Sequence, residues 1–143
     1  MTNQEMEAKV RALIADVNEN QKDTIIGMVQ PGFVACDAAA QTLELSFPVL
    51  AWERNPIGLM QGGVVATVLD YSVACLAVAC ASEKPVTVSL QVSYLRSAPI
   101  GSMLHVRVRA TKMGRTLIHA FAECFEETTP DKLVATANVA YMA

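Results

Sequence analysis

The chain has 143 residues, of which 52% are hydrophobic and 17% are charged, and its formal net charge is −3. This length fits one domain over residues 1–143, whose core can remove roughly 70% of the unfolded chain's surface from water. The low charge excludes intrinsic disorder, and without a dense Lys/Arg run we expect no nucleic-acid partner. The hydrophobic content is high for a monomer and predicts an interface between subunits.

The four cysteines and two histidines show no metal-ligand spacing. No Cys-x-x-Cys pair occurs, and Cys75, Cys80 and Cys124 fall in apolar or strand-like segments. We therefore expect reduced, buried thiols and neither a metal nor a cofactor. The first nine residues are polar and acidic, unlike the basic region that precedes the apolar core of a signal peptide. We expect a cytoplasmic protein.

The first part of the chain mixes a helical pattern with short strand patterns. Apolar residues at helical spacing predict an amphipathic helix over about residues 3–21. Strand-like pieces follow at 24–29 and 33–36. Leu43, Leu45 and Phe47 alternate with polar residues, which predicts a half-buried strand that Pro48 ends. A loop is expected from about residue 50 to residue 60.

Residues 61–81 form an almost continuous apolar run. Its length favours a helix over a strand, and its all-round apolarity predicts burial on nearly every side. A run of this length also fits a membrane span. Asp70 near its middle would cost roughly 3 kcal/mol there, and no Lys/Arg cluster flanks the run closely. A buried helix in a protein without a membrane partner is therefore the favoured interpretation.

After Pro85 the pattern changes to strands. Apolar and polar residues alternate over 86–94, 104–110, 117–125 and 133–141, with short turns between these segments. Several strands joined by short turns predict an antiparallel meander. A long apolar helix can be buried only if a curved sheet wraps it. The expected fold class is therefore α+β, with a long central helix inside a curved antiparallel sheet and an extra N-terminal helix.

Asp70 is the only charged side chain between residues 55 and 82. A carboxylate in apolar surroundings is expensive to bury, so such a residue usually has partners or a task. Desolvation also makes an ionised carboxylate a stronger base or nucleophile. The pattern alone leaves open a purely structural Asp70 that pairs with a hydroxyl or a backbone group.

Gln61, Gly62 and Gly63 precede the predicted central helix. The first N–H groups of a helix lack acceptors, and glycine lets a ligand oxygen approach them, so this start can hold an oxyanion. The glycines equally fit a tight turn. At a rise of 1.5 Å per residue, Asp70 lies about 12 Å from Gly62 along the helix. One chain cannot easily bring both to one carbon, whereas two chains can.

The segment from Asn55 to Asp70, NPIGLMQGGVVATVLD, resembles hotdog-fold acyl-CoA thioesterases of the PaaI-like and thioesterase superfamily member 2 type. Their pattern is N-x-x-G-x-x-H-G-G followed by roughly x-x-x-T-L-x-D, and this chain keeps the spacing. Residues 86–89, 94, 99–101 and 112–116 also resemble the family, so the likeness spans about residues 45–142. It implies a hotdog fold and hydrolysis of an acyl- or aryl-CoA to free acid and coenzyme A. It also implies a homodimer at minimum and a homotetramer as the family expectation.

The resemblance assigns catalytic roles to four residues. Asp70 would activate water as a base or attack the thioester carbonyl as a nucleophile. The N–H of Gly62 would polarise that carbonyl, Asn55 would orient the substrate or the water, and Thr87 would help place the water. The family builds this site between subunits. One chain supplies Asn55 and Gly62, and its neighbour supplies Asp70 and Thr87.

The resemblance also indicates substrate-binding residues. Gln61 and Gly63 lie beside the expected carbonyl site, and Lys112, Gly114 and Arg115 match a turn that approaches the phosphates of coenzyme A. The basic residues fit an ordinary solvated turn equally well. Gln61 stands where the family usually has histidine, and glutamine forms hydrogen bonds but does not titrate. If the family's histidine only positions the loop, activity survives this change; if it contributes to the chemistry, turnover drops or the substrate class shifts.

Two other functions fit a hotdog protein. A module that binds acyl-CoA without cleaving it tends to lose the acid, so Asp70 argues against that reading. A dehydratase or hydratase needs a His–acid pair, but His105 and His119 fall in predicted strands far in sequence from the 55–70 motif. Thioester hydrolysis is therefore the favoured function.

Overall fold

The computed structural model describes residues 1–81 and 83–143, and it contains three α-helices, one short 3-10 helix and six strands among them. In chain order the elements are α1 Asn3–Asn20, α2 Ile25–Val29, β1 Gly32–Asp37, β2 Thr42–Pro48, η1 Ala51–Glu53, α3 Gly62–Cys80, β3 Val86–Tyr94, β4 Met103–Met113, β5 Leu117–Glu126 and β6 Leu133–Met142. The long helices and the strands lie where the sequence patterns predict them.

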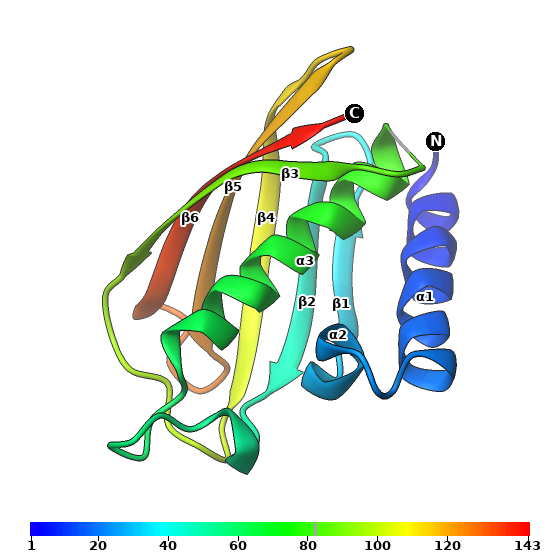
Figure 1. The fold of residues 1–143 in the computed structure, drawn as a ribbon. Coiled ribbons are helices and arrows are strands. Elements are labelled where there is room, and N and C mark those ends of the chain that lie inside the picture. Colours follow the sequence, from blue (N-terminus) through cyan, green and yellow to red (C-terminus); the bar gives the residue numbers. More distant parts are fainter. Residues whose placement is uncertain (82) are drawn as a thin grey trace.

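The strands form one antiparallel sheet with the order β1-β2-β4-β5-β6-β3. This sheet curves around α3, which crosses its concave side (Figure 1). The meander of β4, β5 and β6 is confirmed, while β3 joins the far side of β6 and forms an edge of the sheet. The arrangement is the predicted hotdog fold of a central helix within a curved sheet.

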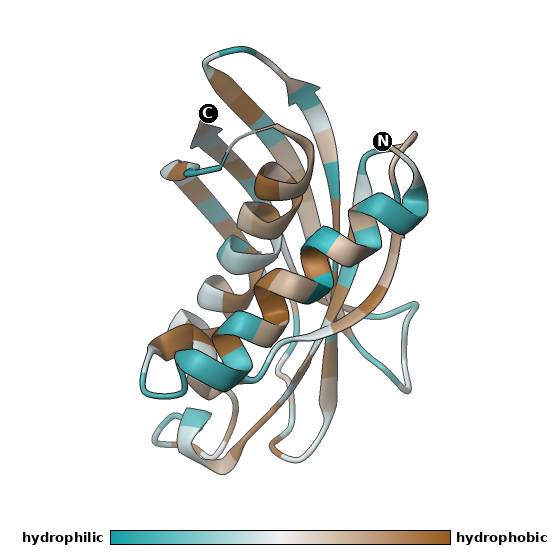
Figure 2. Ribbon diagram, turned by 90° about the vertical axis from the view of Figure 1, so that its right-hand side faces the viewer, coloured by the Kyte–Doolittle hydropathy of each residue, from teal (hydrophilic) through white to brown (hydrophobic). Residues whose placement is uncertain are grey.

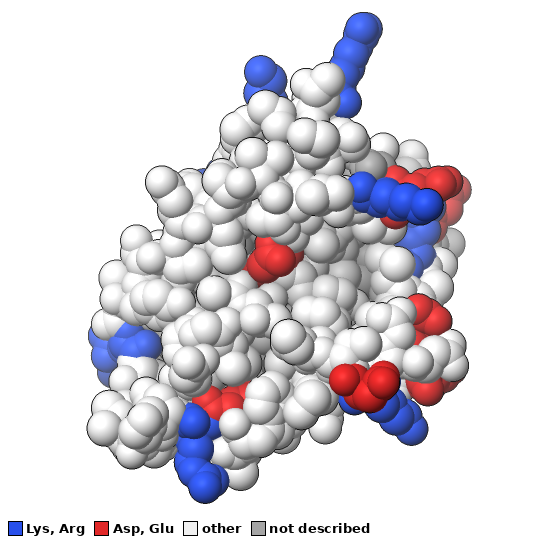
Figure 3. Space-filling view, viewed as in Figure 1, with Lys and Arg blue, Asp and Glu red and all other residues white. Residues whose placement is uncertain are grey.

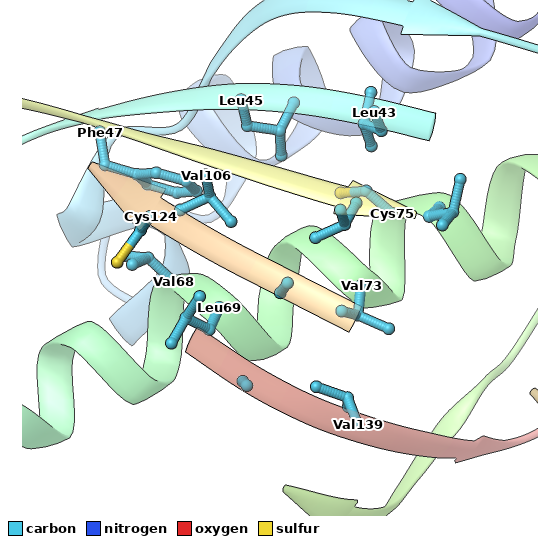
Figure 4. Packing of buried hydrophobic residues seen from close by; sticks show 14 of the residues in the cluster. Leu43, Leu45, Phe47, Val68, Leu69, Val73, Cys75, Val106, Cys124 and Val139 are labelled. Atoms are coloured by element: carbon cyan, nitrogen blue, oxygen red, sulfur yellow. The ribbon is translucent and has the colours of Figure 1, made fainter. Parts of the chain in front are cut away.

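The core lies between α3 and the concave face of the sheet. Because side chains alternate along a strand, one face of β2 contributes Leu43, Leu45 and Phe47. The α3 side chains Val68 and Leu69 pack against this face (Figure 4). The facing positions of β5 are small: Ala120, Ala122 and Cys124 are all buried. These small side chains let the helix backbone come close to the sheet.

Within one chain, α3 is buried on one side rather than on nearly every side as expected. By length and composition α3 could cross a membrane, yet 50% of its apolar window is packed inside the molecule. The sheet covers one side of α3, and the other side keeps a partly exposed stripe. This stripe consists of Gly63, Thr67, Asp70, Ala74 and Val78. Partly exposed positions on an otherwise apolar, buried helix are typical of a surface that a partner covers.

The N-terminal helix α1 covers β1 and part of α3. A capping box starts it, in which the Thr2 hydroxyl accepts from the Glu5 N–H and the Glu5 carboxylate accepts from the Thr2 N–H. Figure 2 shows hydrophobic and hydrophilic residues interleaved along α1, as an amphipathic helix requires. The residues that α1 buries are Met6, Val10, Ile14 and Val17.

The predicted strand at 24–29 is wrong, because this segment forms the short helix α2. The Thr24 side chain accepts a hydrogen bond from the Gly27 N–H at 3.1 Å and caps the helix. A Cβ at position 27 would lie 1.9 Å from the carbonyl oxygen of Gln21, so only glycine fits where α2 folds back on α1. Local capping and this close approach outweigh the strand preference of the β-branched residues.

Candidate active site

Asp70 lies half-buried in the middle of α3, and two hydroxyl groups contact one of its carboxylate oxygens. Its Oδ1 accepts hydrogen bonds from Thr87 Oγ1 at 2.9 Å and from the Tyr141 hydroxyl at 2.6 Å. The Tyr141 hydroxyl also lies 2.7 Å from the main-chain carbonyl oxygen of Asp70. Among the described residues no donor contacts Oδ2. Asp70 is therefore oriented through Oδ1 and leaves Oδ2 available.

Strand pairing brings the two hydroxyls together. β3 pairs antiparallel with β6, and Thr87 lies directly opposite Tyr141. Residues that are directly opposite in an antiparallel pair point to the same face, here the face under α3. Tyr141 is 2% exposed, and its burial, with the Asp70 contact as a lesser cause, raises the pKa of the Tyr141 hydroxyl. At neutral pH it is a protonated donor.

The start of α3 forms a second group of site residues. Gln61 is the N-cap residue, and among the described residues no acceptor contacts the N–H of Gly62 or Gly63. A Cβ on Gly63 would lie 2.8 Å from Gln61 Oε1, and a Cβ on Gly62 would lie 3.3 Å from the Tyr94 ring. The Tyr94 hydroxyl donates to the Gly62 carbonyl at 2.6 Å. The double glycine therefore fits a crowded helix start with free N–H groups.

Asn55 shapes the loop that precedes α3. Its Oδ1 accepts from the Ile57 N–H at 3.0 Å and from the Leu59 N–H at 3.1 Å, while its own N–H donates to the Leu59 carbonyl at 2.6 Å. The side-chain oxygen is therefore engaged, while no acceptor contacts the amide NH2 in the part of the chain that the structure describes. Asn55 and Gly62 line the same cleft of about 380 Å3, together with Tyr94.

The predicted catalytic residues thus form two separate pairs in one chain. Asp70 contacts Thr87, while Asn55 shares a cleft with Gly62, and Asp70 does not line that cleft. Asp70 follows Gly62 by eight positions along the helix, which corresponds to about 12 Å. Figure 3 shows few charged side chains on the face over α3 and more of them around its rim. One chain alone therefore does not bring the two pairs together.

The predicted coenzyme A contacts lie far from the Asn55 loop of the same chain. Lys112 lies near the end of β4, and Gly114 and Arg115 lie in the β4–β5 turn, which projects from the opposite end of the sheet (Figure 1). Gly114 N–H donates to the Leu117 carbonyl at 3.0 Å, and a Cβ at position 114 would lie 2.6 Å from that oxygen. Glycine is therefore required by the tight hairpin itself. A single chain does not bring this turn to the Asn55–Gly62 cleft.

Neither histidine provides the acid–base pair that a dehydratase would need beside Asp70. His105 alternates with the buried residues Leu104 and Val106, so it lies on the face of the sheet opposite α3. There its ring contacts Glu44 at 2.9 Å and Glu127 at 3.1 Å. His119 lines a shallow groove among polar strand residues such as Gln91.

Two further residues of this region, Tyr141 and Glu53, are not identified by the sequence patterns. Tyr141 sits in an apolar strand pattern and looks like an ordinary core residue, and only its register opposite Thr87 identifies it. Glu53 looks like an exposed loop acid but is 1% exposed, and neither carboxylate oxygen has a hydrogen-bond partner among the described residues. Burial raises the pKa of Glu53 to about 7. Its main-chain carbonyl accepts from the Gln61 N–H at 2.7 Å and ties the loop to the start of α3.

Solved structures of other proteins share this fold. The E. coli PaaI protein from the phenylacetic acid degradation operon matches with a TM-score of 0.82 at 14% identity, covering 99% of this chain and 95% of that chain. Thioesterase superfamily member 2 from Mus musculus also matches with a TM-score of 0.82, at 22% identity, covering 96% of each chain. At these identities the likeness shows the fold, and it confirms the predicted hotdog architecture.

Sequence comparison identifies the family. Residues 57–133 match the thioesterase superfamily. Acyl-coenzyme A thioesterase 13 from Mus musculus is 30% identical over 100 residues, which cover 68% of this chain and 70% of that protein. The matched segment contains the helix start at Gly62, Asp70 and Thr87. The family predicted from the 55–70 motif is therefore confirmed, and the chain belongs to the thioesterase superfamily.

Proposed function

We propose that this protein hydrolyses the thioester bond of an acyl- or aryl-CoA in the cytoplasm. The proposal rests on the hydrogen bonds and the exposure of the Asp70 carboxylate. Two hydroxyls contact Oδ1, whereas Oδ2 has no partner among the described residues and lies on a half-exposed stripe of an apolar helix. A carboxylate oriented in this way is suited to act as a base or a nucleophile. The name of the mouse relative, an acyl-coenzyme A thioesterase, supports the substrate class.

The proposed active unit is a dimer built across β3 and the exposed stripe of α3. β3 forms an edge of the sheet, where Val86 is 63% exposed and Val88 is 53% exposed. Exposed apolar residues on an unpaired edge favour pairing with another strand. A second copy at this edge would supply the Gly62 group that the Asp70 of the first copy lacks. The family resemblance further favours a tetramer made of two such dimers.

In the proposed mechanism, the thioester carbonyl binds at the start of α3. The Gly62 N–H and the helix dipole stabilise the negative charge that develops on the carbonyl oxygen. As a base, Asp70 Oδ2 takes a proton from water while the water oxygen bonds to the carbonyl carbon. The tetrahedral intermediate then expels the coenzyme A thiolate. As a nucleophile, Oδ2 itself bonds to that carbon, the carbon–sulfur bond breaks and the coenzyme A thiolate leaves. Water then hydrolyses the resulting anhydride to the free acid and the Asp70 carboxylate.

Asn55 and Thr87 act beside these two groups. Asn55 lines the same cleft as Gly62, and its amide NH2, which has no acceptor among the described residues, can orient the substrate or the water. Thr87 donates to Oδ1 of Asp70, so its contribution passes through the carboxylate. Gln61, Gly63 and the basic turn of the partner chain complete the proposed contacts to the substrate.

The decisive experiment replaces the carboxylate with its isosteric amide. We expect Asp70→Asn to lower kcat for acyl-CoA hydrolysis by about 100- to 10,000-fold, because general-base catalysis contributes on that order. Asp131→Asn, at an exposed position, is the matched control and should keep wild-type turnover. Hydrolysis is followed by thiol release over a panel of acyl- and aryl-CoA substrates. An unchanged rate in folded Asp70→Asn protein would overturn the proposal.

A further inference from the structure

The Tyr141 hydroxyl occupies an unusual position under α3. It lies 2.6 Å from Oδ1 of Asp70 and 2.7 Å from the main-chain carbonyl oxygen of the same residue. A phenol carries one proton, so it can donate fully to only one of these acceptors at a time. The side chain is 2% exposed, so water does not compete for that proton.

The second donor to Oδ1 is weaker and less enclosed. Thr87 Oγ1 lies 2.9 Å from Oδ1 and belongs to an exposed position of the edge strand β3. Tyr141 belongs to β6, which is paired on both sides by β5 and β3. The rigid donor is therefore Tyr141, and it approaches the carboxylate from the core side. Oδ2 is consequently turned away from the core.

We propose that Tyr141 is a positioning residue of the active site, which fixes Asp70 through Oδ1 and reserves Oδ2 for the reaction. The inference rests on the proposed function of Asp70 as the reacting carboxylate. A hydrogen bond from a neutral donor stabilises the ionised carboxylate relative to its protonated form. Tyr141 therefore sets the direction of Oδ2, and we expect its loss to move the acid limb of the activity profile to higher pH.

Few other groups can produce the same pH effect. Thr87 faces Asp70 from β3 but does not titrate, and Ile118, which is paired with Tyr141 from β5, is apolar. Cys75 of α3 is the remaining titratable group that acts on Tyr141. Burial raises the pKa of the Cys75 thiol to about 12, so it stays neutral in the range of an activity assay.

The test compares the pH dependence of hydrolysis in Tyr141→Phe with that of the wild type. We expect kcat to fall by about tenfold with KM changed less than twofold, and the acid limb of the profile to move up by about one pH unit. Tyr71→Phe is the matched control. It removes another hydroxyl with a buried oxygen, which has no hydrogen-bond partner among the described residues, so the acid limb should stay in place.

A second variant keeps the aromatic ring and the hydroxyl. Replacing Tyr141 by 3-fluorotyrosine gives a more acidic, stronger donor, so the acid limb should move to lower pH, opposite to Tyr141→Phe. A uniform loss of activity with an unmoved acid limb in both variants would overturn the inference. Asp70→Asn, measured in parallel, separates this failure from a failure of the proposed function. If Asp70→Asn is inactive while Tyr141→Phe has the wild-type profile, only the inference is wrong.

Discussion

Glu53 makes a quantitative prediction about stability. Its side chain is 1% exposed, neither carboxylate oxygen has a hydrogen-bond partner among the described residues, and burial raises the pKa of Glu53 from 4.5 to about 7. The nearby Leu50 backbone N–H lowers this pKa somewhat but lies outside hydrogen-bond geometry. The folded protein therefore keeps Glu53 neutral at mildly acidic pH, whereas the unfolded chain ionises it.

The Glu53 proton determines whether the free energy of unfolding rises or falls with pH. Between pH 4.5 and pH 7 the unfolded chain has lost the Glu53 proton and the folded chain has kept it, so the free energy of unfolding falls as the pH rises. Below pH 4.5 both states hold the proton, and well above pH 7 both have lost it. A difference of about 2.5 pKa units corresponds to about 3 kcal/mol lost across this window.

The perturbation is Glu53→Gln, which has the same shape but no charge. At pH 5 we expect the variant and the wild type to unfold within about 1 kcal/mol of each other. At pH 8 the variant should melt about 6 to 12 °C higher, since 1 kcal/mol corresponds to about 2 to 4 °C in a chain of this size. Thermal unfolding at one fixed protein concentration measures this, because oligomer stability depends on concentration.

The control is Glu19→Gln, which changes an exposed acid of α1. Its melting temperature should follow that of the wild type at both pH values. If Glu53→Gln and the wild type change in parallel from pH 5 to pH 8, the carboxyl is already ionised in the folded state. That result would show that burial does not keep Glu53 protonated in the folded protein.

Three further predictions concern the start of α3, the edge of the sheet and α2. Gly62→Pro removes one N–H at a helix position where proline is tolerated, and it should lower kcat at least about 100-fold. Gly62→Ala adds a similar Cβ but keeps the N–H, so its kcat should fall far less. Co-expressed Gly62→Pro and Asp70→Asn chains should recover activity in thiol-release assays if sites are shared, and none if each chain acts alone. Val88→Lys should reduce dimer mass in light scattering together with activity, while Val34→Lys on the opposite edge strand β1 should not. Gly27→Ala should lower the free energy of unfolding in urea by about 2 kcal/mol or more, because its Cβ would overlap the Gln21 carbonyl.

Much of the fold was predictable because it depends on periodicity. The alternation around Leu43 to Phe47 and the apolar run around Asp70 locate β2 and α3 correctly. The segment at 24–29 failed because the Thr24 cap and the Gly27 approach to Gln21 are contacts between neighbours in space, which a strand pattern does not report. The one-sided burial of α3 was missed for a similar reason, since hydrophobicity does not distinguish the core from an interface.

The candidate site divides in the same way. Asn55, Gly62 and Asp70 lie close together in the sequence, so a short motif is enough to identify them. Tyr141 reaches Asp70 only through the pairing of β6 with β3, which depends on a register between residues distant in sequence. Glu53 was missed because the burial of a loop acid depends on how the loop folds over the core. Pairing and loop packing are tertiary properties, and short-range patterns do not record them.

Because Tyr94 forms a hydrogen bond with Gly62, β3 contacts both groups of site residues. One end of this strand reaches the carboxylate through Thr87, and the other end is fastened to the helix start through Tyr94. In the proposed dimer, in which two copies pair along β3, this strand would set the distance between Asp70 of one chain and Gly62 of the other. A slip of two residues would displace them by about 7 Å and disable both sites of the pair at once. Selection for turnover would then act on the pairing register of the two β3 strands as strongly as on the reacting groups.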